Sequence, residues 1–173
     1  DGIRDVAVTG VQTCALPIYG ALASVELQNI EKLRFDDRAI DLRTAEGQSA
    51  NLVARVLGAV FGRQAVSNAE YAGIGLYFFD QLAYPADALM QLALNARIGA
   101  NASHAQVVDL LYTNVVGQAP TAQARAEYVD MLDSGSVSVA SLGLMAANTG
   151  LNANNINLVG LARTGLDYLP YPS

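Results

Sequence analysis

Apolar residues recur at helical spacing from about Gln48 onward, and this periodicity restricts most of the chain to a helical fold. Between Leu52 and Phe61 they fall at i, i+1, i+4, i+5, i+8 and i+9, which predicts one broad apolar helix face. The composition, 52% hydrophobic and 15% charged, supplies enough apolar surface for a buried core and excludes a disordered chain. Later segments show similar inward positions: Tyr71, Ile74, Phe78 and Leu82; Leu89, Leu92, Ala93 and Ala96; Val107, Val108, Leu111 and Val115; Ala124, Tyr128, Met131 and Leu132; Leu142 and Met145.

Capping residues divide this region into separate helices. We predict capping boxes at Ser67–Glu70 and at Ser103–Gln106. In a capping box, a Ser or Thr side chain and a Glu or Gln side chain three residues later each bond the backbone of the other residue. Further predicted starts are Pro85, Thr121 and Ser138, and predicted ends are Gly62, Gly99, Gly117, Ser134-Gly135 and Gly150.

Residues 19–46 have the alternation of strands instead. Ala23 to Leu27 alternate in polarity, Asp36-Asp37 marks a turn, and Ala39 to Leu42 form a second short run. This pattern predicts a β-hairpin, and a hairpin alone is only marginally stable in water. We therefore expect it to pack on another part of the protein.

The helical region, residues 47–150, contains an internal repeat. Leu52–Gly62 aligns with Val107–Gly117 at an offset of about 55 residues, and Asp87–Asn95 aligns with Ala140–Asn148 at about 53. The predicted fold is therefore mainly α: a small helical bundle of two related three-helix units, about 49–98 and 103–149, preceded by a short β-hairpin. A C-terminal tail, residues 151–173, is expected to lie against the units.

Residues 1–18 resemble a translated sequencing adapter rather than native protein. Read as codons, Asp1–Asp5 and Val8–Ile18 match such an adapter, and Val6-Ala7 correspond to its index. A native N-terminal strand or a signal peptide is the alternative, although Asp1 and Asp5 are unsuited to the basic start of a signal peptide. The single cysteine, Cys14, lies in this range, so a catalytic thiol is not expected.

The second unit resembles the bacterial domain-of-unknown-function family numbered 4214. The family pattern L-Y-x-x-V-x-G-R-x-P corresponds to residues 111–120, with Gln118 where the family has Arg. A later block corresponds to Tyr128-Val129, Leu132 and Gly135, with Tyr128 where the family has Trp. The resemblance implies a helical domain like that of phycobilisome linkers, and it implies no reaction.

Two flanking segments extend this resemblance. Residues 24–42 are similar to a strand segment that precedes such helices in large exported bacterial proteins, and Asn155–Tyr168 is similar to the terminal segment of type I secreted proteins. The setting that this implies is extracellular or at the cell surface. A type I signal is read from an unfolded, weakly charged segment, and Ser134–Ser173 fits, because it is uncharged from Ser134 to Ala162.

Candidate chemical residues are few, and each has a structural interpretation that we favour. His104, the single histidine, is interpreted as a solvated residue in the first turn of a helix. Oxygen ligands for calcium could come from Asp36, Asp37 and Asp41, but a hairpin turn is the preferred interpretation. Asp130 and Asp133 are assigned to a polar helix face, and Gly73 and Gly75 do not form a phosphate loop.

Aromatic residues cluster between residues 71 and 84. Phe78 and Phe79 cannot share one narrow stripe, so one aromatic side chain is expected to be half exposed and available to an interface, although core packing is preferred. Tyr112 and Tyr128 are interpreted as packing residues. The cluster consists of Tyr71, Tyr77, Phe78, Phe79 and Tyr84.

These observations predict a non-catalytic module with no catalytic, cofactor-binding or metal-binding residues. The favoured function is an interaction or structural module from the C-terminal end of an exported bacterial protein, including a type I secretion signal. The alternatives are an assembly linker domain, or an accessory domain of a secreted hydrolase. The expected partner is another protein or an upstream domain of the same protein, with the tail contacting a type I exporter. The formal net charge of −6 disfavours nucleic acid, and asparagines in the uncharged stretch disfavour a membrane span.

Overall fold

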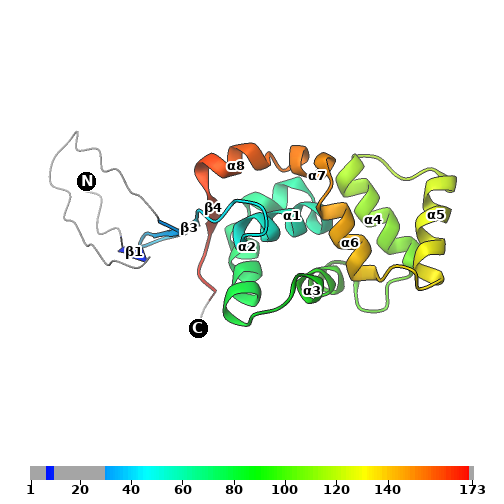
Figure 1. Ribbon diagram of the computed structural model, residues 1–173, viewed down its shortest axis with the longest axis horizontal. Coiled ribbons are helices and arrows are strands. Elements are labelled where there is room, and N and C mark those ends of the chain that lie inside the picture. Colours follow the sequence, from blue (N-terminus) through cyan, green and yellow to red (C-terminus); the bar gives the residue numbers. More distant parts are fainter. Residues whose placement is uncertain (1–6, 10–29, 172–173) are drawn as a thin grey trace.

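The computed structural model describes residues 7–9 and 30–171, and within them it confirms a mainly helical bundle with a small antiparallel sheet at one end (Figure 1). The helices are α1 (Ser49–Phe61), α2 (Ala69–Leu76), α3 (Ala86–Ile98), α4 (His104–Val116), α5 (Ala122–Asp133), α6 (Val139–Ala147), α7 (Gly150–Asn155) and α8 (Leu158–Thr164), with a 3₁₀ turn η1 (Arg63–Ser67) and a π-helical turn η2 (Tyr77–Gln81).

The sheet contains the predicted hairpin and one strand from the far end of the chain. Strands β2 (Lys32–Arg34) and β3 (Ala39–Asp41) pair antiparallel, with the predicted turn between them. Strand β4 (Leu166–Tyr168) pairs with the other edge of β3, and β1 (Ala7–Thr9) pairs with β2, which gives the order β1-β2-β3-β4. Strand β1 falls in the range that resembles an adapter. The predicted run Ala23–Leu27 lies outside the described residues.

Helix α1 belongs to two hydrophobic cores. One core joins α1 to α3, α4, α5 and α6, and the other joins α1 to α2, α3, Ile156 and Leu166. Along α1, Val56 and Val60 face the first core, whereas Val53 and Leu57 face the second. The helix is therefore buried on most sides and lies in the middle of the bundle (Figure 1).

Most predicted helix ends are observed, with two corrections. The capping box at Ser103 and Gln106 is present, and Thr121 and Ser138 cap α5 and α6. Asn68, rather than Ser67, caps α2, because its side chain accepts hydrogen bonds from the backbone of residues 70 and 71. Gly150 begins α7 instead of ending the preceding helix, which stops at Ala147.

The inward face predicted for the second helix is also wrong in part. The buried residues of α2 are Ala72, Gly73 and Leu76, whereas Tyr71 and Leu82 are 41% and 45% exposed. Two features explain the difference. The C-terminal segment covers the side of α2 that carries Gly73, and the π turn η2 changes the helical register before Leu82.

The C-terminal segment is folded, not extended away from the bundle. The described part of Ser134–Ser173 forms α6, α7, α8 and β4, and it lies against the helices as predicted. The Asn152 side chain is fully buried and donates to the carbonyl oxygens of Arg55 and Ala147 at 3.0 and 2.8 Å. After β4, the Leu169 amide donates to the Ala69 carbonyl at 2.9 Å and so fixes the segment across α2.

Gly73 makes that crossing possible, and replacing it tests the close approach. A β-carbon at Gly73 would lie 1.8 Å from the Leu169 carbonyl oxygen, far inside van der Waals contact with backbone. We expect Gly73→Ala to lower the free energy of unfolding by about 2 kcal/mol, measured by urea denaturation. The control is Gly150→Ala, because a β-carbon there meets no atom within 4 Å. Equal stability of the two variants would contradict the observed crossing.

Candidate functional site

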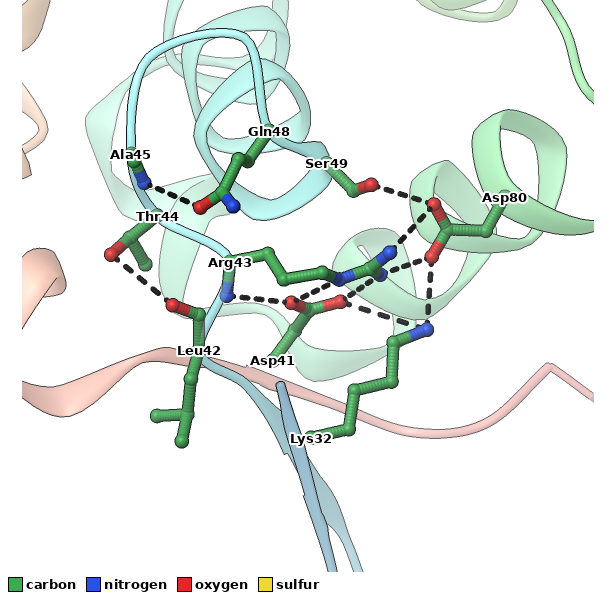
Figure 2. A network of polar contacts seen from close by, with 9 residues as sticks. All are labelled: Lys32, Asp41, Leu42, Arg43, Thr44, Ala45, Gln48, Ser49 and Asp80. Carbon is green, nitrogen blue, oxygen red and sulfur yellow. Dashed lines mark hydrogen bonds and ion pairs between the residues drawn. The ribbon is translucent and has the colours of Figure 1, made fainter. Parts of the chain in front are cut away.

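Four charged side chains meet where the sheet joins α1 and η2 (Figure 2). Lys32 and Asp41 are directly opposite each other on β2 and β3. Arg43 follows β3, and Asp80 comes from η2. We call these four residues the ion cluster. It brings together two carboxylates and two cations and is therefore formally neutral.

The guanidinium group of Arg43 lies between the two carboxylates of the ion cluster (Figure 2). Its Nε and Nη2 atoms donate to the two oxygens of Asp41 at 3.0 and 2.5 Å. Nη1 donates to Oδ1 of Asp80 at 3.3 Å, and Nη2 also contacts Oδ2 of Asp80. Lys32 donates from Nζ to Oδ2 of Asp80 at 2.9 Å and lies 3.7 Å from Oδ2 of Asp41.

The ion cluster also holds the start of α1. The Ser49 hydroxyl donates to Oδ1 of Asp80 at 2.6 Å. The carbonyl oxygen of Arg43 accepts hydrogen bonds from the amides of Ala50 and Asn51 at 3.1 and 3.3 Å. These amides are among the groups that a helix start leaves without a partner inside the helix, and the N-cap residue Gln48 provides no side-chain cap. The backbone before α1 therefore replaces a side-chain cap.

The contacts in the ion cluster favour the charged forms of Asp80 and Arg43. Burial opposes ionisation of Asp80, but hydrogen bonds from Arg43, Ser49 and Lys32 outweigh it, so the pKa of Asp80 is lowered. The hydrogen bond to the fully buried Asp41 raises the pKa of Arg43. A carboxylate whose pKa is lowered in this way is a weak base, and its oxygens are already occupied. The geometry is that of a structural connection, not of an acid–base pair prepared for catalysis.

A pocket of about 400 Å³ lies beside the ion cluster. Its walls include Tyr77, Tyr168 and Tyr171, and the rings of Tyr77 and Tyr171 lie 5.1 Å apart. Burial raises the pKa of the Tyr168 phenol. Lys32 and Asp80 also reach this pocket, but each already has a partner.

The candidate residues that the sequence suggested do not meet at one site. His104 Nδ1 lies 2.5 Å from Asp133 Oδ1, at the surface between α4 and α5. Asp36 and Asp37 are exposed in the hairpin turn, whereas Asp41 is buried and paired with Arg43. Across residues 7–9 and 30–171, no group of His, Cys, Asp and Glu side chains could hold a metal ion. The same part of the chain contains no helix with the length and apolar character of a membrane span.

The glycines and aromatic residues near α2 have packing roles. Gly75 faces Val53, whose side chain would lie 2.7 Å from an added β-carbon. Phe78 and Phe79 are partly buried against the second core, whereas Tyr71, which was predicted to face inward, is 41% exposed. The Tyr71 ring lies 5.2 Å from that of Phe61.

An open apolar groove of about 410 Å³ lies at the opposite end of the bundle from the sheet, among α4, α5, α6 and α7. We call it the α4–α7 groove. Met145 and Leu151 are 54% and 55% exposed there. Tyr112 and Tyr128, which were expected to serve only in packing, also line it. Sequence reasoning did not identify this groove, although its α6 and α7 walls lie in the uncharged stretch.

No family model, curated protein or solved structure matches this chain.

The lowered pKa of Asp80 predicts a pH dependence of stability. A lowered pKa in the folded state means that ionised Asp80 stabilises the fold above its ordinary pKa of 3.8. That stabilisation is lost as the pH falls through the lowered value. We expect Asp80→Asn to reduce the free energy of unfolding by about 2 kcal/mol at neutral pH. The difference from the wild type should shrink below pH 3.8, as followed by urea denaturation across a pH series.

The matched control is Asp109→Asn, which removes a carboxylate from the exposed pair with Arg125. A surface pair contributes at most about 1 kcal/mol, so this variant should stay close to the wild type. A constant difference between Asp80→Asn and the wild type down to strongly acidic pH would show that the Asp80 charge does not stabilise the fold.

Proposed function

We propose that this chain is a non-catalytic protein-interaction module and that it binds its partner through the α4–α7 groove. The observation that carries the proposal is the exposure of large apolar side chains around one concave surface, above all Met145 and Leu151. A contiguous apolar patch with an exposed rim is typical of a binding surface, because leaving such side chains in water is unfavourable. Aromatic residues and Met, both present in this groove, are enriched in protein interfaces.

The distribution of ionisable groups supports binding over catalysis. The groove is lined by aliphatic, methionine, tyrosine and threonine side chains, and none of its described lining residues carries a carboxylate, an imidazole or an amino group. The charged groups that do cluster, at the other end of the bundle, bond one another. Acid–base catalysis most often uses an imidazole, a carboxylate or an amino group that is free to reach the substrate.

We also propose membership of the domain-of-unknown-function family numbered 4214 and an extracellular or cell-surface location. The motif positions have structural roles consistent with this proposal. Leu111, Val115 and Leu132 are buried in the first core. Gly117 ends α4 with a φ of 84°, which a side chain would disfavour. An assembly linker would use the same groove. An accessory domain of a secreted hydrolase would use it to contact the catalytic part.

A displayed library of random peptides, selected on the intact chain, tests the groove even though the natural partner is unidentified. We expect enriched peptides to bind the wild type at least about tenfold more tightly than Met145→Glu, because a carboxylate in the groove opposes apolar contact. Binding would be measured by titration of labelled peptides with purified protein.

The matched control is Val159→Glu, which introduces the same charge at a residue that is 77% exposed on α8 and does not line the groove. This variant should bind the enriched peptides like the wild type. Peptides that bind Met145→Glu as tightly as Val159→Glu would overturn the proposal.

Export is tested separately. The absence of charge from Ser134 to Ala162 supports a type I signal in this segment, which would be read before the segment folds. A passenger protein fused to the full chain should reach the medium of a host with a type I exporter. The same fusion without residues 134–173 should stay inside the cell. Retention of both fusions, in a host that exports a known substrate, would contradict export through this segment.

A further inference from the structure

We infer that the partner of the α4–α7 groove is an amphipathic helix with aromatic and aliphatic residues at positions i, i+3 and i+7 and with basic residues along one flank. This inference rests on the proposed interaction function and adds the chemistry of the partner. A second pocket within the same chain and the charges of α5 support it.

The second pocket, of about 220 Å³, lies among α1, α2 and α3. Its lining residues correspond to those of the α4–α7 groove at the two offsets of the predicted repeat. On the first helix of each unit the pairs are Val53 and Val108, Val56 and Leu111, and Leu57 and Tyr112; on the third helix they are Leu89 and Leu142, Leu92 and Met145, and Ala93 and Ala146.

The two pockets differ in what the middle helix contributes. In the first, Tyr71 and Ile74 from α2 and Phe78 from η2 form one wall, at positions i, i+3 and i+7. In the second, α5 contributes only Tyr128, and the groove is larger, about 410 Å³ against about 220 Å³. The α2 ridge of Tyr71, Ile74 and Phe78 therefore shows which shape complements walls of this kind. A helix from a partner could place such a ridge where α5 does not reach.

The charges of α5, the helix that contributes Tyr128 to the groove, favour a basic partner. This helix has exposed carboxylates at Glu127 and Asp130, and a third at Asp133 lies 2.5 Å from Nδ1 of His104. The single basic residue of α5, Arg125, is bound to Asp109 through two hydrogen bonds of 2.7 and 2.8 Å. The α6 and α7 walls carry no charge. The carboxylates of α5 would attract lysine or arginine residues on the flank of the partner that faces this helix.

A second copy of the chain is a less suitable occupant. Each chain has a formal net charge of −6, so electrostatic repulsion opposes the approach of two copies. Self-association is accordingly one of the outcomes that the experiment distinguishes.

The probe is a synthetic peptide of residues 68–82, which contains the α2 ridge and is offered to the intact chain. One form keeps the native sequence. A second form carries Glu70→Lys and Asp80→Lys, which makes its flank basic. A third form is the basic peptide with Tyr71, Ile74 and Phe78 replaced by Ala. Binding is measured by fluorescence anisotropy at low salt and at about 0.5 M salt.

The basic form should bind about fivefold more tightly than the native form at low salt, and salt should reduce this ratio. The alanine form should bind at least about tenfold more weakly than the basic form, because it lacks the apolar ridge. Met145→Glu in the protein should weaken binding of the basic form, Val159→Glu should not, and Glu127→Gln should reduce the advantage of the basic flank.

Equal binding of the native and basic forms, or of the basic and alanine forms, would overturn the inference. If the random library nevertheless yields peptides that depend on Met145, the interaction function stands and only the partner chemistry is wrong. If neither experiment shows dependence on Met145, both proposals fail. A dimer in sedimentation velocity that Met145→Glu converts to a monomer would identify a second copy as the occupant and would also overturn the inference.

Discussion

The burial of α1 on most sides is the constraint on which the rest of the structure depends. A helix in such a position supplies apolar residues to two cores at once, and Val53, Val56, Leu57 and Val60 do so. It also places its first turn, with Ser49 and Asn51, in the interior, where backbone amides and polar side chains need partners. The carbonyl of Arg43 and the carboxylate of Asp80 supply them.

The two ends of the molecule differ in how their side chains are covered. At the sheet end, charges of both signs are paired, and the C-terminal segment closes over α2 through the Leu169 hydrogen bond. At the α5 end, no equivalent segment among the described residues covers the apolar side chains, and the α4–α7 groove stays open. The ion cluster joins the sheet to α1 and η2, whereas the groove leaves Met145 and Leu151 exposed.

Local signals in the sequence predicted local structure well. The hairpin turn, the capping box at Ser103 and the Gly117 helix end depend on residues that are close in sequence, so their patterns were sufficient. The ion cluster was not predicted, because Asp80 is 48 residues from Lys32 and only the fold brings them together. The local signs of the cluster are a lysine and an aspartate on the two strands of a hairpin and an arginine two residues after that aspartate.

Other differences arise from contacts between segments distant in sequence. The buried face of α2 is set by the strand that returns from the C-terminus, not by the positions of its largest side chains. The α4–α7 groove could not be predicted because exposed and buried apolar residues have the same periodicity. Leu142 and Met145 lie on α6 and both fit the apolar periodicity of a buried helix face, yet only Leu142 is buried.

Hydrogen exchange of the Asp41→Asn variant tests most directly whether the ion cluster stabilises both hydrophobic cores through α1, the helix that they share. The account predicts that amides of α1 and of α4, which both contribute to the first core, lose protection together, by an amount equivalent to about 3 kcal/mol. Unchanged protection in both helices would contradict this account, because the ion cluster would then be dispensable for the fold. Loss confined to the first turn of α1, with α4 unchanged, would also contradict it, because the two cores would then unfold independently.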